Sequence, residues 1–248
     1  MSDSWPPAPV WLRRVITALG AYSAAMVALV AAAILSAPQS LPAHRAVIKM
    51  AVVLLLVWVV AGGWLQLRHR RSACLLLGAL PGNWQVRFVL GCTLLALVEE
   101  AITTALTNAA PLFGVRLGEA YITASANYLD VVAFHSVVVF VPQFAAWAVT
   151  LSRYDFHPSL VFLLYGIQGV INETLFGGPS NLLAGHWVFI YGLMVYLPAY
   201  CVPRDRGARP PHAMAYLLPF VLAMLFVMPV ALLISTIHPV RIHFPPIR

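Results

Sequence analysis

Long apolar stretches recur along the chain and limit the folds that it can adopt. A helix of about 20 apolar residues crosses a bilayer, and backbone in lipid must satisfy its own hydrogen bonds. The sequence therefore predicts an all-α, polytopic integral membrane helical bundle with about seven transmembrane helices. The predicted spans lie near residues 13–35, 47–67, 88–110, 130–151, 159–177, 182–201 and 213–237.

Composition supports this fold class and bears on the partners. The chain has 248 residues, of which 61% are hydrophobic and only 9% charged, whereas about 25% of a soluble domain is charged. The net charge of +7 comes from basic residues scattered between the spans, which favours contacts with lipid headgroups over nucleic-acid binding. We expect one membrane domain over residues 1–248, multi-pass in a cell membrane (inner or plasma). The lipid bilayer is its expected partner, and oligomer or complex formation is left open.

The arginines predict the orientation, because cytoplasmic loops carry an excess of Arg and Lys. A cytoplasmic N-terminus places ten basic residues inside: Arg13, Arg14, Arg68, Arg70, Arg71, Arg87, Arg153, Arg204, Arg206 and Arg209. Five remain outside, namely Arg45, Lys49, Arg116, Arg241 and Arg248.

Two smaller features lie outside the spans. The apolar residues 74–80 are too short to cross alone, and we expect an interfacial or half-inserted piece there. The three cysteines, Cys74, Cys92 and Cys201, form no CxxC pair. Their spacing therefore supports neither a thiol-redox motif nor a zinc finger.

Two adjacent glutamates occupy the middle of the third predicted span. An ionisable residue at the bilayer centre costs at least about 2.5 to 3.5 kcal/mol, so such residues usually face an interior and serve a function. Glu100 shares its helical face with Thr103, Thr104 and Thr107, a stripe that runs toward the outer surface. Glu100 is therefore the better site candidate, and we expect Glu99 to brace a neighbouring helix.

Further polar residues lie on the following spans, Gln168 near the middle and the others toward the outer side. They are His135, Gln168, Asn172, Glu173 and His186. Asp130 fits a helix N-cap at the membrane surface. The histidines in loops and near chain ends, His238 and His243 among them, receive no role.

Carboxylates and imidazoles together are ligands for Zn²⁺ and similar metals, and they also serve general acid–base chemistry. The candidate divalent-metal ligands are His135, His186, Glu100 and Glu173, and the candidate catalytic residues are Glu100, Glu99, His135 and Asn172. Thr104, Thr107 and Gln168 are candidate substrate contacts. A membrane hydrolase, a proton- or ion-coupled transporter and a non-catalytic membrane subunit all remain open.

The order of these residues resembles the CPBP intramembrane proteases, which include CAAX-processing and bacteriocin-processing enzymes. The family pattern is EExxxR, FxxxH and HxxxN on separate membrane helices. The matching positions are Glu99, Glu100, His135 and Asn172, while Thr104, Val131 and Gln168 replace the arginine, the phenylalanine and the histidine of the third motif. The resemblance implies that paired glutamates and histidine activate a water against a hydrophobic peptide or lipid substrate.

Overall fold

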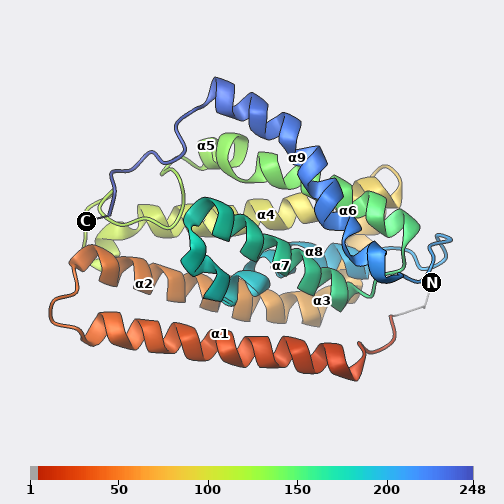
Figure 1. Cartoon of the computed structure of the whole chain (residues 1–248), viewed down its shortest axis with the longest axis horizontal. Helices are drawn as coiled ribbons and strands as arrows, with labels where there is room; N and C mark the ends of the chain where they lie inside the picture. The colour runs from red at the N-terminus through yellow and green to blue at the C-terminus, as the bar shows by residue number, and fades with distance from the viewer. Residues whose placement is uncertain (1–4, 248) are drawn as a thin grey trace.

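Helices provide nearly all the regular structure in residues 5–247, the part of the chain that the computed structural model describes (Figure 1). In chain order the elements are α1 (Val10–Ser36), α2 (Pro42–Leu54), the π-helical η1 (Leu55–Gly62), α3 (Gly63–Ala79), α4 (Trp84–Asn108), η2 (Ala110–Phe113), α5 (Tyr128–Asp130), the π-helical η3 (Val131–His135), α6 (Val137–Arg153), α7 (Pro158–Gly177), η4 (Pro179–Leu183), α8 (His186–Tyr200), η5 (Ala213–Tyr216) and α9 (Leu218–Ile237). The all-α prediction is confirmed.

The apolar helices match the expected membrane character. Five helical segments are long and apolar enough to cross a bilayer, and the bent pair α5–η3 and α6 adds a sixth if it is one span. The sixth predicted span, 182–201, corresponds to α8, which has only 15 residues and is largely buried in the bundle.

The separate piece expected at residues 74–80 is not observed. Residues 74–79 continue α3, which joins α2 and η1 in one helical rod from Pro42 to Ala79. Gly62 and Gly63 both keep helical dihedral angles, so they do not break it. The arginines after Leu67 also favour helix, because arginine is a good helix former and these side chains are largely exposed.

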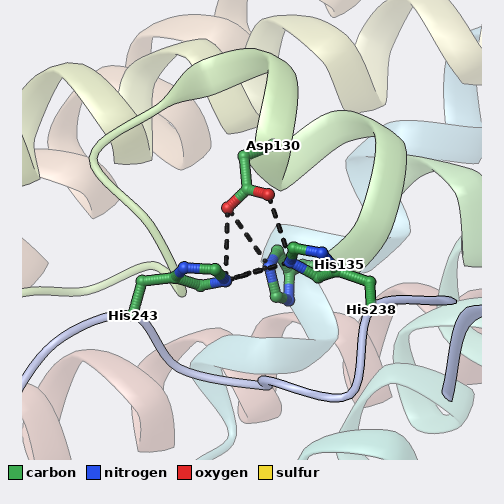
Figure 2. Close-up of side chains that lie close together, drawn as sticks. All are labelled: Asp130, His135, His238 and His243. Carbon is green, nitrogen blue, oxygen red and sulfur yellow. Dashed lines mark hydrogen bonds and ion pairs between the residues drawn. The ribbon is translucent and has the colours of Figure 1, made fainter. Parts of the chain in front are cut away.

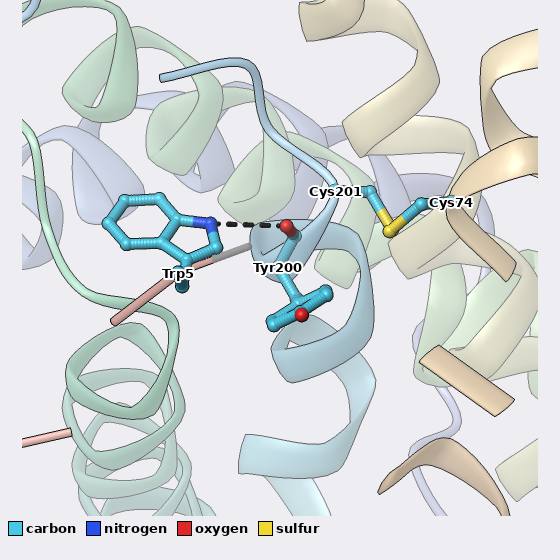
Figure 3. Close-up of a disulfide and its surroundings, with 4 residues drawn as sticks. All are labelled: Trp5, Cys74, Tyr200 and Cys201. Atoms are coloured by element: carbon cyan, nitrogen blue, oxygen red, sulfur yellow. Dashed lines mark hydrogen bonds between the residues drawn. A yellow bond between two sulfur atoms is a disulfide. The ribbon is translucent and has the colours of Figure 1, made fainter. Parts of the chain in front are cut away.

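A disulfide between Cys74 and Cys201 ties α3 to the end of α8 (Figure 3). The two cysteines are 127 residues apart, so their spacing gave no sign of the bond. Beside the bond, the Trp5 indole donates a hydrogen bond of 3.1 Å to the Tyr200 carbonyl. Cys92 is buried and free. The disulfide therefore fixes the end of the bundle where the chain begins.

Close packing of α7 against α8 forms the centre of the bundle. Gly166 faces the Val188 backbone and Gly192 faces the Phe162 ring, so the two helices approach where side chains are absent. Trp147 and Tyr165 are fully buried beside them. In Figure 1, α1 and α9 lie along opposite edges of this core.

The span that carries Asp130 and His135 is broken. The α5–η3 segment meets α6 at 46°. Ser136, between them, has non-helical dihedral angles of φ −128° and ψ −72°. Asn127, rather than Asp130, caps this segment, and its side chain accepts a hydrogen bond from the Leu129 amide. The cap expected at Asp130 is thus wrong by one helical turn, which leaves the Asp130 carboxylate free for another role.

Candidate functional site

Four side chains converge at the end of the bundle where the C-terminal residues lie (Figure 2). Asp130 ends α5, His135 ends η3, and His238 and His243 follow α9. One donor atom from each of the four residues lies within 4.8 Å of the other three. The cluster therefore joins the broken span to the C-terminal tail.

The donor atoms in this cluster are close together. The Nε2 atom of His243 lies 3.2 Å from that of His135 and 3.1 Å from that of His238. The Asp130 carboxylate oxygens lie 3.4 Å from the Nε2 atoms of His135 and His243, and 3.2 Å from that of His238. All three imidazoles thus present the same nitrogen to one carboxylate.

Five of the six pairwise separations, 3.1–3.4 Å, are close to those between ligands of a zinc ion, and the remaining pair, His135 and His238, lies within 4.8 Å. Ligands about 2.0–2.1 Å from a tetrahedral zinc lie about 3.3–3.4 Å from one another. Among the residues that the structure describes, Asp130 Oδ2 is buried without a hydrogen-bond partner, and a buried polar atom normally has one. A cation at the centre would satisfy this oxygen. The donor set of three imidazoles and one carboxylate therefore fits Zn²⁺ or a similar first-row metal.

Local contacts hold two of the histidines in place. The Phe134 ring stacks on His238 with the ring centroids 4.5 Å apart. The backbone amide of His243 donates a hydrogen bond of 2.9 Å to the Ala124 carbonyl. The π-helical turn places Phe134 and His135 side by side, and such turns are frequent at functional sites. These contacts therefore help to orient two of the three imidazoles in the docked tail.

A second polar group lies deeper, on α4 and α7. Glu99 and Glu100 are 4% and 7% exposed. The Thr103 hydroxyl donates to Glu100 at 3.2 Å, and the Tyr191 hydroxyl donates to Glu173 at 2.5 Å. Within residues 5–247, no Arg, Lys or His nitrogen comes within 4.0 Å of these three carboxyl groups. Hydroxyl groups, rather than cations, are therefore the partners of Glu100 and Glu173.

Amide side chains continue this network between α6 and α7. The Gln168 amide donates to the Gln143 oxygen at 2.7 Å, and the Asn172 amide lies 3.5 Å from the same oxygen. The Trp147 indole donates to the Gln168 oxygen at 3.2 Å. Gln168 and Gln143 therefore satisfy each other inside the bundle.

The threonine stripe of α4 has mixed partners. The Thr107 hydroxyl accepts a hydrogen bond of 3.2 Å from the Ile122 amide, while the buried Thr104 hydroxyl has no partner within residues 5–247. The Ser136 hydroxyl lies beside the Glu100 carboxyl. Ser136 directly follows His135 in the chain, so the broken span carries one residue of each polar group.

In the structure His135 lies beside Asp130, His238 and His243. The sequence predicted a different set of partners for it, namely His186, Glu100 and Glu173. His186 stacks on Trp187 instead, with ring centroids 5.1 Å apart. Glu100 and Glu173 belong to the buried network and not to the one metal-ligand cluster found within residues 5–247. Sequence reasoning missed His238 and His243, although its orientation placed the tail on the same side as Asp130.

No family model, curated protein or solved structure matches this chain. The function must therefore be inferred from the two clusters.

Proposed function

We propose that this protein is an integral membrane protein that binds one zinc ion through Asp130, His135, His238 and His243. The observation that carries this proposal is the convergence of four donor atoms within 4.8 Å. The four donors provide a full tetrahedral set, which is typical of zinc sites that hold structure. None of the donors is a thiolate, so oxidation would not destroy the site.

The proposed topology has seven spans, with the N-terminus in the cytoplasm. It counts the rod from Pro42 to Ala79 as one span and adds α8, whose burial among other helices compensates for its short length. The zinc site then lies at the outer surface. The Cys74–Cys201 disulfide lies at the arginine-rich inner end.

Metal analysis of the purified protein tests this proposal. The wild type should carry about one zinc ion per chain, as expected for one structural site. His238→Ala and Asp130→Asn should lose the metal. His212→Ala is the matched control, because His212 bonds to Tyr154 at the opposite end of the bundle. Equal, substoichiometric zinc in all four proteins would overturn the proposal.

A membrane hydrolase that resembles the CPBP proteases is a second candidate. It is favoured by the buried carboxyl groups of Glu99 and Glu100 and the partly buried one of Glu173, which lack basic partners within residues 5–247. Membrane-buried ionisable groups usually serve a function. In this scheme Glu99 and Glu100 activate water, Asn172 positions it, and Thr104, Thr107 and Gln168 contact a hydrophobic peptide or lipid.

Hydrolysis of fluorogenic hydrophobic peptides and lipid esters in proteoliposomes tests this second candidate. Glu100→Gln should abolish turnover, whereas Glu119→Gln should not, because Glu119 pairs with Arg116 in an exposed loop. Absence of turnover in the wild type, together with proton or cation flux that Glu100→Gln removes, would favour a transporter instead.

A further inference from the structure

The C-terminal tail connects the proposed zinc site to the loop that covers the end of α4. The tail comprises residues 238–247, here called the C-terminal strap, and the loop comprises residues 114–127, here called the cap loop. We propose that metal binding fastens the C-terminal strap onto the cap loop and so closes this end of the bundle over the polar face of α4. This inference rests on the proposed zinc site.

The ligands come from two segments that lie far apart in the sequence. Asp130 and His135 belong to the broken span, while His238 and His243 belong to the C-terminal strap. In Figure 2 the strap passes beneath the Asp130 carboxylate, with both of its histidines turned toward it. A bound ion would therefore act as a crosslink between residues about 100 positions apart, and such long loops cost most entropy to close.

The strap also contacts the cap loop. The Phe244 and Tyr121 rings stack with centroids 4.7 Å apart. The backbone amide of His243 bonds to the Ala124 carbonyl at 2.9 Å. A zinc ligand and its neighbour thus hold the loop at two points.

The cap loop in turn contacts the end of α4. The Ile122 amide donates to the Thr107 hydroxyl, and the Asn108 side chain donates to the Ala126 carbonyl at 2.8 Å. Thr107 belongs to the threonine stripe that leads to Glu100. Opening of the cap loop would therefore expose this stripe to the aqueous side.

No residue of the strap is fully buried, and the neighbouring helix α9 is mostly exposed. Apart from contacts among the four ligands, the strap is held by the stacking of His238 on Phe134 and of Phe244 on Tyr121, by the hydrogen bond from the His243 amide to the Ala124 carbonyl, and by the Arg241 guanidinium over the Phe176 ring. Segments with few buried contacts open at low free-energy cost. Metal coordination is thus the interaction that would stabilise the docked strap most.

Limited trypsin digestion in lipid nanodiscs tests this coupling, because each segment contains one cleavage site. Arg241 lies in the strap and Arg116 in the cap loop, where the Arg116 side chain is 91% exposed. If trypsin cleaves only when the strap and the cap loop are open, Zn²⁺ at 100 times its Kd should slow cleavage by up to about 100-fold at both sites. Cleavage after Arg71, at the opposite end, serves as the internal control and should not change.

Phe244→Ala separates coupling from metal binding. Phe244 is not a ligand, so this variant should bind zinc with wild-type affinity in a chelator competition. Zinc should still protect Arg241, but protection of Arg116 should fall markedly. If zinc binds the wild type and protects neither site, the strap proposal is wrong and the zinc site stands. If chelator competition detects no zinc binding, the proposed function itself fails.

Discussion

The Nε2 atoms of His135 and His243 lie 3.2 Å apart, although 108 residues separate the two histidines in the sequence. The Asp130 carboxylate lies 3.4 Å from both nitrogens, and His238 completes the group. Each nitrogen is a donor atom for a metal ion, and Asp130 supplies the only carboxylate in the cluster. A metal ion is the simplest partner that satisfies all four side chains together.

Loss of one ligand should weaken zinc binding sharply. Removal of a group that merely orients a ligand usually costs 10- to 100-fold in affinity. His135→Ala and His243→Ala should therefore each lower zinc affinity by more than about 100-fold, as measured by chelator competition. His186→Ala should leave the affinity unchanged, because His186 stacks on Trp187 away from the cluster. A loss of zinc affinity in His186→Ala, with none in His135→Ala or His243→Ala, would show that the ligands are misassigned.

A methyl group at the contact between α7 and α8 should destabilise the bundle. A Cβ atom at residue 166 would clash with the carbonyl oxygen of Val188, which cannot move without shifting α8. Overpacking of this kind costs about 1–3 kcal/mol. Gly166→Ala should therefore lower the free energy of unfolding by that amount, measured with denaturant in detergent.

Gly78→Ala is the matched control for this packing test. A Cβ at residue 78 meets nothing within 4 Å, and the residue lies inside α3. Alanine in a helix is favoured over glycine by about 1 kcal/mol, so this variant should be neutral or slightly stabilising. Equal destabilisation by the two variants would contradict the packing described for α7 and α8.

The orientation of the protein can be tested with introduced cysteines. Gln39 and Ser72 are exposed at opposite ends of the bundle. With a cytoplasmic N-terminus, an impermeant maleimide should label Gln39→Cys in intact cells, and Ser72→Cys only after lysis. The native cysteines should add little background, since two form a disulfide and the third is buried.

The reverse labelling pattern would place the N-terminus outside. It would also put the Cys74–Cys201 bond in an oxidising compartment, where most disulfides occur.

Apolar periodicity located the helices but not their breaks. The predicted span 130–151 is observed as Tyr128–Arg153, yet nothing in its apolar pattern indicated the bend at Ser136. Arg68, Arg70 and Arg71 interrupt the apolar pattern before residue 74, and a run of charged residues usually indicates a linker between spans. The helix tolerates those arginines because it extends beyond the apolar stretch and exposes them.

The buried network was more accessible to sequence reasoning than the metal cluster. Helical spacing placed Glu100 beside the threonines, and Thr103 does bond to it. His238 and His243 lie in an irregular tail, where no periodicity tells which way a side chain points. Their approach to His135 depends on the path of the chain after α9, which only the three-dimensional structure supplies.

X-ray absorption at the zinc K-edge of the purified protein tests the central claim most directly. The proposed site predicts four nitrogen or oxygen neighbours at about 2.0–2.1 Å, with the outer-shell scattering of imidazole rings. His238→Ala should lose that imidazole signal or the zinc itself. A spectrum dominated by sulfur at about 2.3 Å, or a wild-type protein that holds no zinc after exposure to the metal, would contradict the account.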